Sequence, residues 1–229
     1  AEAKKPLVIV GGGVRYSEAG ETVEKFCEEF KIPFGESQAG KSACKSSHPY
    51  CLGGIGVTGT YASNIIAEDA DVVIAIGSRM SDFTTSSKRL FKNPDVKFVT
   101  INNCRFHAYK MDAAKAVGDA KVTVEALTKK LRARGYVSAY NGEIEEAKKV
   151  WDKEIVRLAG IEYTGDDFEP IIKARDPRTI PEFVKMTNGK ITQTAALAAI
   201  RRVIDEDATI ITAGGSLPSC MQRMWRTDK

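Results

Sequence analysis

The stretch PLVIVGGG, residues Pro6 to Gly13, decides the fold. Leu7 to Val10 form an apolar run without polar alternation, which is typical of a parallel strand buried on both faces. The glycines that follow, Gly11 to Gly13, predict a turn directly after the strand. A second unit of the same design, Asp71 to Ile76, ends at Gly77. Two such units predict an open α/β sheet whose loops gather at the carboxyl ends of its strands.

Further strands and helices alternate around these two units. The pattern predicts an extended segment that begins at 32–34 and a strand at 96–101. It also predicts a helix from Thr60 to Asp69 and a helix through Val124, Leu127 and Leu131. Ser17 is predicted to cap another helix, whose inner face carries Val23, Phe26, Cys27 and Phe30. In the helix from Thr60, the side chains expected to face inward are Tyr61, Ile65 and Ile66. We therefore expect a parallel sheet flanked by helices over residues 1–134.

The remainder of the chain differs in composition. Residues 135–189 predict an amphipathic helix followed by an extended linker. One face of the helix carries Ile144, Ala147, Trp151, Ile155 and Leu158. The linker contains Pro170, Pro177 and Pro181. Residues 190–229 predict a helix from Thr192 and a strand from Ala208 to Thr212. One helix and one strand cannot form a core. We therefore expect the start of an incomplete second α/β unit, whose remainder lies outside this chain.

Charge and composition exclude several classes of protein. The net charge is +4, but 34 basic and 30 acidic residues are interleaved, which argues against a nucleic-acid surface. No apolar run is long enough to span a membrane. The five cysteines form no CxxC pair, and His48 and His107 lie far apart, so we expect no metal site and a reduced, cytoplasmic protein.

Glycine-rich turns are the candidate binding elements. Gly11 to Gly13 precede Arg15, and Gly77 precedes Arg79, so two arginines follow turns at one edge of the predicted sheet. Nucleotides bind at such an edge, where arginines can meet a diphosphate. A further glycine stretch, Gly53 to Asn64, opens a helix. The alternatives stay open: tight structural turns, and arginines paired with surface carboxylates. These residues contain no complete catalytic constellation.

Longer motifs carry a family resemblance. The stretch GESQAGKSA (Gly35 to Ala43), then His48-Pro49, then Gly53 to Thr85 resembles the middle domain of thiamine-diphosphate-dependent enzymes, a Rossmann-like domain that the acetolactate synthase branch shows clearly. The stretch from Gln193 to Trp225 resembles the first helix, strand and turn of their pyrophosphate-binding domain. The resemblance implies a middle domain over 1–134, a helix and linker over 135–189, and the truncated start of the thiamine-diphosphate-binding domain over 190–229.

The resemblance also implies chemistry. It implies that the cofactors are thiamine diphosphate and Mg²⁺ and that the substrate is a small molecule. It also implies that the full-length protein is a homo-oligomer, a dimer or a tetramer. Three details are most similar to one branch of this family: the turn GKSA, the strand end INNCRFHAYK, and the final turn GGSLP followed by MQRMW. That branch hydrolyses a carbon–carbon bond of a cyclic vicinal diketone in inositol catabolism. The alternatives are an acetolactate synthase-like carboligase and a freestanding nucleotide-binding module.

Individual residues follow from the same resemblance. Gly215, Ser216 and Leu217 match the turn that approaches the cofactor diphosphate. Positions that hold FAD in acetolactate synthase correspond here to Gly11–Gly13, Gly77 and Arg79, but Asn102 and Asn103 replace the acidic residues expected beside them. An amide pairs less strongly with ribose hydroxyls than a carboxylate does, so we expect no tightly bound FAD. The catalytic glutamate and the metal motif of the family lie outside this chain, which alone is expected to show no turnover.

Overall fold

The computed structural model describes residues 2–161, 178, 182, 185–186, 191–212 and 214–228. Most of the predicted linker, with Pro170, Pro177 and Pro181, lies outside the described residues. The chain divides into two compact units, Ala1–Trp151 with Arg226–Lys229, and Asp152–Trp225. Helix α7 (Glu143–Ala159) crosses from one unit into the other. The domain boundaries at 134 and 189 stay predictions.

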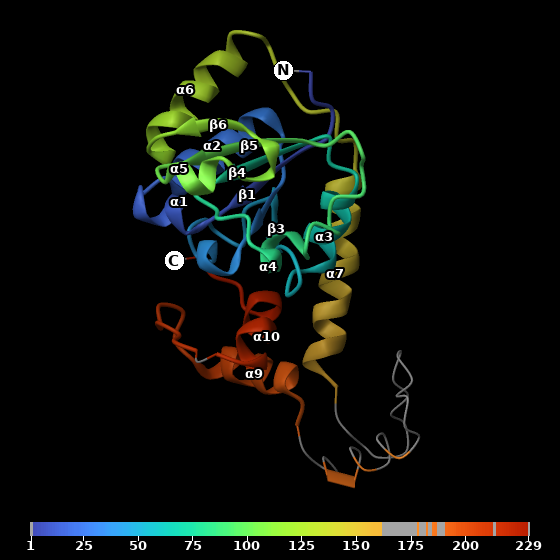
Figure 1. Cartoon of the computed structure of the whole chain (residues 1–229). Helices are drawn as coiled ribbons and strands as arrows, with labels where there is room; N and C mark the ends of the chain where they lie inside the picture. Colours follow the sequence, from blue (N-terminus) through green and yellow to red (C-terminus); the bar gives the residue numbers. More distant parts are fainter. Residues whose placement is uncertain are drawn as a thin grey trace. The chain divides into compact units, whose positions relative to one another are not determined.

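The first unit is built on a six-stranded sheet in the order β3-β2-β1-β4-β5-β6 (Figure 1). All neighbouring strands are parallel, which confirms the predicted parallel α/β sheet. Its strands are β1 (Pro6–Val10), β2 (Phe34–Glu36), β3 (Cys51–Gly54), β4 (Val72–Ile76), β5 (Lys97–Asn102) and β6 (Ala114–Val117). The two apolar runs that predicted the fold, β1 and β4, lie side by side at the centre of this sheet.

Helices cover both faces of the sheet, as predicted. They are α1 (Gly12–Tyr16), α2 (Gly20–Phe30), α3 (Tyr61–Glu68), α4 (Asp82–Thr85), α5 (Arg105–Ala108) and α6 (Ala120–Arg132), with the short 3-10 turns η1 (Gln38–Gly40) and η2 (Lys110–Asp112). On one face, Val8 and Val10 pack with Phe26 and Phe30 of α2 and Val124 of α6. This cluster is the main core of the unit, because its members are almost completely removed from water.

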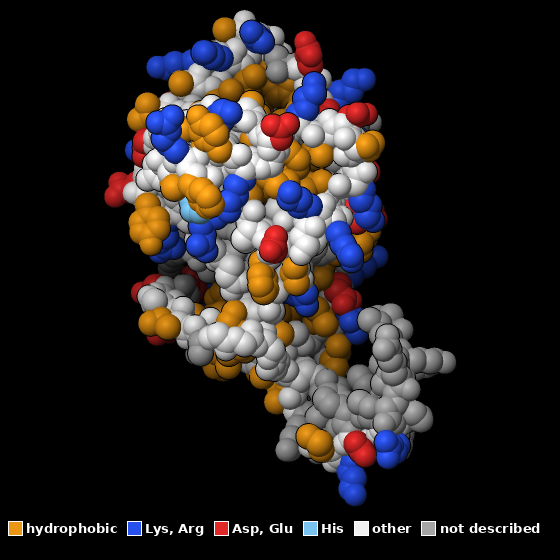
Figure 2. All heavy atoms as spheres, in the orientation of Figure 1, with side chains coloured by type: hydrophobic (Ala, Val, Ile, Leu, Met, Phe, Trp, Pro, Cys, Tyr) orange, Lys and Arg blue, Asp and Glu red, His pale blue; other side chains and the backbone are white. Residues whose placement is uncertain are grey.

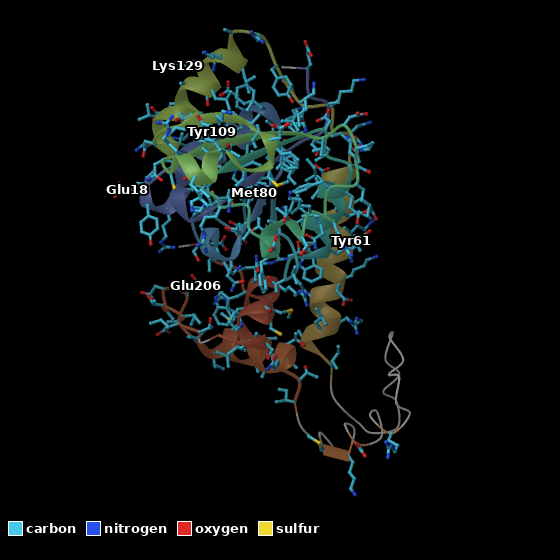
Figure 3. The ribbon with its side chains drawn as sticks, in the orientation of Figure 1. Glu18, Tyr61, Met80, Tyr109, Lys129 and Glu206 are labelled. Atoms are coloured by element: carbon cyan, nitrogen blue, oxygen red, sulfur yellow. The ribbon has the colours of Figure 1, made fainter. Side chains whose placement is uncertain are left out.

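Two local predictions on these helices are wrong. Ser17 does not cap α2: it ends α1, and α2 begins at Gly20 after Ala19, because the glycine turn itself starts a short helix at Gly12. Tyr61 does not face inward either, being the first residue of α3 and 47% exposed (Figure 3). The start of α3 is as predicted, since the Thr60 hydroxyl accepts a hydrogen bond from the Ser63 N–H at 3.0 Å.

The C-terminal residues of the chain belong to the first unit. The Ser46 N–H donates to the Thr227 carbonyl at 2.8 Å, and the Thr227 N–H donates to the Ser46 hydroxyl at 2.9 Å. The Ser47 N–H donates to the Asp228 carboxylate at 2.7 Å. These three bonds hold the short segment 226–228 against the loop before β3.

The second unit contains α9 (Gln193–Val203) and α10 (Ser216–Met224), which pack through Leu197, Met221 and Trp225. The helix predicted from Thr192 is confirmed, with the Thr192 hydroxyl as its cap. The strand predicted at 208–212 is wrong: these residues belong to no strand, and Ile211 is 91% exposed. A strand needs a neighbour for its backbone groups, and the described part of this unit supplies helices instead.

The distribution of charged side chains and the lengths of the helices agree with what the composition predicts. On the face shown in Figure 2, the basic and acidic side chains are interspersed with apolar ones. Across the described parts of the chain, no helix combines the length and apolar character that a bilayer crossing requires.

Candidate functional site

The glycines after β1 and β4 lie where the strand order of the sheet changes direction, the usual place for a nucleotide. Here the two loops contact each other through their backbones. The Gly13 N–H donates to the Gly77 carbonyl at 3.1 Å, and the Gly11 N–H donates to the Ile76 carbonyl at 2.8 Å. A Cβ on Gly11 would lie 2.3 Å from the Gly77 oxygen. Main-chain packing therefore explains these glycines.

The two arginines beside these turns share no hydrogen-bond partner among the described residues. Arg15 is exposed, and its Nη1 reaches the Ser42 carbonyl at 3.4 Å. Arg79 is exposed too, and its backbone carbonyl accepts a bond from Lys110 Nζ at 3.2 Å. Neither guanidinium forms an ion pair within the described residues. Of the two roles that the sequence left open for these arginines, contact with a diphosphate or pairing with surface carboxylates, the described residues show no pairing with carboxylates.

Asn102, at the end of β5, ties two loops of this edge together. Its Nδ2 donates to the Ser78 carbonyl at 3.1 Å, and its Oδ1 accepts from the Cys104 N–H at 2.9 Å. The side chain is buried, whereas the neighbouring Asn103 is exposed. A carboxylate at position 102 could not donate to Ser78, so the amide is required by the packing of this edge.

Replacing Asn102 with Asp is therefore expected to destabilise the chain by about 2 kcal/mol, because a buried carboxylate would face the Ser78 carbonyl. The same change at exposed Asn103 is the matched control and should alter stability by less than about 0.5 kcal/mol. Urea unfolding of both variants at pH 7 measures the difference. Equal stability of the two variants would contradict the bridging role of Asn102.

The glycine stretch before α3 is closed by its own hydrogen bonds. The Gly56 N–H donates to Asn64 Oδ1 at 2.9 Å, and Asn64 Nδ2 donates to the Gly56 carbonyl at 2.9 Å. Gly56 has a φ of +95°, and a Cβ there would lie 2.0 Å from the Phe83 oxygen. Of the two interpretations left open by the sequence, the geometry favours the structural turn.

The turn before α10 is different, because it is open. Gly215 has a φ of +111°, and a Cβ built on Gly214 or Gly215 meets no atom of the described residues within 4 Å. Ser216 begins α10 and Leu217 follows it, both of them exposed. The structure thus places all three predicted cofactor-binding residues at one helix start, where backbone N–H groups lack helical partners and the helix dipole favours an anion.

Two neighbours of this turn, Gln193 and Cys220, were not predicted from the sequence. Gln193, the first residue of α9, donates from Nε2 to the Ser216 hydroxyl at 3.0 Å. Cys220, one turn into α10, donates from Sγ to Gln193 Oε1 at 3.5 Å. Gln193 and Ser216 are 23 positions apart, so no local pattern connects them.

A buried carboxylate, Glu36, also escaped prediction. It ends β2 with 0% exposure, and burial raises its pKa to about 7, opposed by the Lys41 ammonium and the Ser42 N–H. Burial lowers the pKa of Lys41, and Glu36 counteracts this shift. The two groups stabilise each other in a poorly solvated part of the sheet edge.

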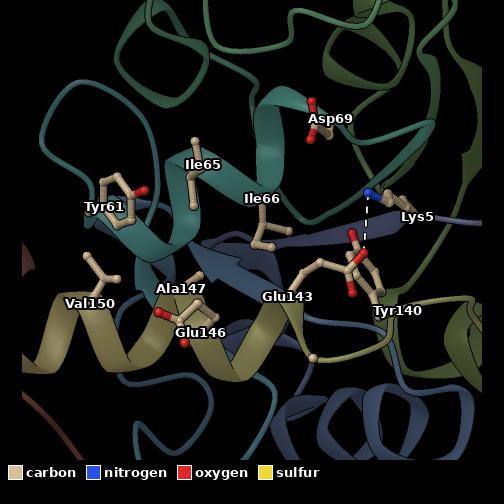
Figure 4. Close-up of a pocket in the computed structure, with 11 residues that line it drawn as sticks. Lys5, Tyr61, Ile65, Ile66, Asp69, Tyr140, Glu143, Glu146, Ala147 and Val150 are labelled. Atoms are coloured by element: carbon tan, nitrogen blue, oxygen red, sulfur yellow. Dashed lines mark ion pairs between the residues drawn. The ribbon is translucent and has the colours of Figure 1, made fainter.

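Two hollows in the first unit lack a catalytic arrangement. One, of about 420 Å³, lies between α3 and α7: Ile65, Ile66, Ala147 and Val150 line it, and an ion pair of 3.3 Å joins Lys5 to Glu143 at its end (Figure 4). These side chains offer packing and charge but no nucleophile beside a base.

The other hollow, of about 510 Å³, contains Cys44 and His48. Burial raises the pKa of the Cys44 thiol and lowers the pKa of the His48 imidazole. Both groups are therefore neutral at pH 7, and Cys44 lacks the thiolate character of a reactive cysteine. The open turn at Gly215 remains the candidate site.

Most of the first unit matches a protein-family model. The model of the thiamine pyrophosphate enzyme central domain matches residues 1–127. The chain therefore belongs to the thiamine pyrophosphate enzymes, and residues 1–127 are their central domain.

Several curated relatives match along nearly the whole chain. A 3D-(3,5/4)-trihydroxycyclohexane-1,2-dione hydrolase of Clostridium botulinum (strain Alaska E43 / Type E3) is 58% identical over 98% of this chain and 35% of its own length. The hydrolase of Clostridium perfringens (strain ATCC 13124) is 59% identical with the same coverage. The hydrolase of Bacillus thuringiensis (strain Al Hakam) is 51% identical over 99% of this chain and 35% of its own. The chain spans about a third of the length of these relatives.

Proposed function

We propose that this chain is part of a thiamine-diphosphate-dependent hydrolase that cleaves a carbon–carbon bond of trihydroxycyclohexanedione, a cyclic vicinal diketone, to a deoxyglucuronate in inositol catabolism. The observation that carries the proposal is the 58% identity, over 98% of the chain, to a relative named for this dione. Residues 1–134 are the middle domain in this proposal, 135–189 the connecting helix and linker, and 190–229 the start of the cofactor-binding domain.

The residues of the open turn fit an anionic cofactor. Gly215, Ser216 and Leu217 offer backbone N–H groups and one hydroxyl, and Gly214 and Gly215 leave the space beside them free. These three residues would hold the diphosphate. When bound, thiamine diphosphate supplies the electron sink that carbon–carbon cleavage requires. This chain supplies binding and orientation, and we assign it no catalytic residue.

Mg²⁺ is held by residues outside this chain in the proposal. Among the residues that the structure describes, no three His, Cys, Asp or Glu side chains gather as metal ligands would. The middle domain serves as scaffold without tightly bound FAD, which is supported by the backbone contact of Gly11 with Gly77 and by the amide of Asn102. All five cysteines are free, which supports a cytoplasmic protein, and we propose a homo-oligomer.

The test is activity of the full-length protein with thiamine diphosphate and Mg²⁺. We expect hydrolysis of the dione, no acetolactate from pyruvate, and no flavin absorbance in the pure protein. The 229-residue chain alone should show no turnover, because the proposal assigns it no catalytic residue.

Other outcomes point elsewhere. Pyruvate turnover together with flavin bands would replace the proposal with an acetolactate synthase-like carboligase. Micromolar nucleotide binding by the isolated chain, without dione turnover by the full-length protein, would favour a nucleotide-binding module.

A further inference from the structure

The carboxamide of Gln193 is held at both ends. Its Nε2 donates to Ser216 Oγ at 3.0 Å, and its Oε1 accepts the Cys220 thiol at 3.5 Å. An amide nitrogen only donates and an amide oxygen only accepts. In the structure the amide nitrogen faces Ser216 and the amide oxygen faces Cys220.

This orientation decides what the Ser216 hydroxyl can do. Because Ser216 Oγ accepts the Gln193 N–H, its own hydrogen is available for another acceptor. Ser216 is exposed at the start of α10, beside the open space at Gly214 and Gly215. The hydroxyl and the first N–H groups of α10 thus all act as donors at one end of the helix.

The backbone that carries Gln193 is itself fixed. The Thr192 hydroxyl accepts the Ala195 N–H at 3.1 Å, and the Thr194 hydroxyl donates to the Leu158 carbonyl at 2.8 Å. Helices α9 and α10 share the cluster of Leu197, Met221 and Trp225. Gln193 therefore extends from a rigid helix start toward a helix that is packed against it.

We propose that Gln193 is a positioning residue for the cofactor diphosphate, which keeps the Ser216 hydroxyl as a hydrogen-bond donor toward that anion. The inference rests on the proposed function of the Gly215–Leu217 turn. Gln193 acts through Ser216, and Cys220 holds the amide in the required orientation.

The replacement Gln193→Glu tests the direction of the hydrogen bond. A carboxylate of the same length only accepts, so the Ser216 hydrogen turns toward position 193, and a negative charge stands beside the diphosphate. We expect thiamine diphosphate to bind the full-length protein about 100-fold more weakly, and about 10-fold more weakly in Gln193→Ala. The matched control is Gln38→Glu, the same charge change at an exposed residue of the first unit, which should leave the dissociation constant unchanged.

A double-variant cycle tests whether Gln193 acts through Ser216. In a Ser216→Ala background, Gln193→Ala should weaken binding no further. An equal additional loss in that background would overturn the positioning role, because Gln193 would then act independently of the hydroxyl.

Alkylation of Cys220 gives a readout that needs no cofactor. Removing the acceptor in Gln193→Ala should speed reaction of Cys220 with iodoacetamide several-fold. The carboxylate of Gln193→Glu should slow the reaction, because a nearby negative charge repels the thiolate that attacks the reagent. Peptide mass spectrometry of the 229-residue chain measures the alkylation rate of Cys220 in both variants, with exposed Cys104 as the internal reference. A purely structural defect would speed the reaction in both variants and would contradict the proposal.

The two proposals fail separately. If the wild-type full-length protein binds thiamine diphosphate and Gln193→Glu binds it equally well, the role of Gln193 is wrong and the proposed function stands. If the wild-type protein does not bind thiamine diphosphate in the presence of Mg²⁺, the proposed function itself is wrong.

Discussion

Replacing Gly77 with Ala is expected to destabilise the first unit by about 4 kcal/mol, or to prevent its folding. A Cβ at this position would lie 2.5 Å from Gly13 Cα and 2.8 Å from Gly13 N, so the clash is with main chain that cannot rotate away. Relief would require the loops after β1 and β4 to separate, which would break the bond from the Gly13 N–H to the Gly77 carbonyl.

Gly135→Ala is the matched control for this substitution. Its φ of +59° is nearly equal to the +60° of Gly77, but a Cβ there meets no atom within 4 Å. The backbone strain is therefore common to both variants and costs about 1 kcal/mol. Urea unfolding gives the free energy of unfolding for each. Similar losses in the two variants would show that the glycine contact at the sheet edge does not matter for stability.

Replacing Glu36 with Gln is expected to change how stability depends on pH. The folded-state pKa of about 7 lies above the ordinary glutamate value of about 4.5, so folding favours the protonated carboxyl. Its contribution to stability is full below pH 4.5 and is lost as the pH rises through 7. The wild-type chain should therefore lose on the order of 3 kcal/mol relative to Glu36→Gln between pH 4.5 and pH 8.

The groups that face Glu36 determine the size of this difference. Lys41 and the Ser42 N–H favour the ionised carboxylate, whereas the thiols of Cys44 and Cys51 keep their protons because burial raises their pKa values. Urea unfolding of both chains at a series of pH values measures the difference. Glu125→Gln, at an exposed position of α6, is the control and should differ from the wild type equally at every pH. A pH-independent difference for Glu36→Gln would contradict the raised pKa.

The central part of the fold could be predicted because burial leaves a mark in the sequence. β1 and β4 are covered on both faces, so they appear as uninterrupted apolar runs. The edge strands β3 and β6 carry no such run. Strand β3 ends in two glycines, and β6 contains Lys115 and is largely exposed. The strand predicted at 208–212 has the local pattern but no neighbour, and pairing rather than pattern makes a strand.

The candidate site could be predicted only by resemblance. A glycine required by main-chain contact and a glycine required by a ligand look identical in sequence, since both need the Cβ to be absent. What separates them is the opposing segment: Gly77 meets Gly13, whereas Gly215 meets nothing within 4 Å. Gln193, the partner of Ser216, lies 23 positions away from it in the chain, so neither feature leaves a local pattern.

The strand order β3-β2-β1-β4-β5-β6 also bears on how the central domain is made. Of these strands, β1 emerges first from the ribosome and lies inside the sheet. Every later strand joins an outer edge of the growing sheet. Strands β2 and β3 are added on one side of β1, and then β4, β5 and β6 are added on the other. No strand has to insert between two that are already paired. Because N-terminal parts of a chain fold first during synthesis, the sheet can be complete once Val117 has emerged, before α9 and α10 are translated.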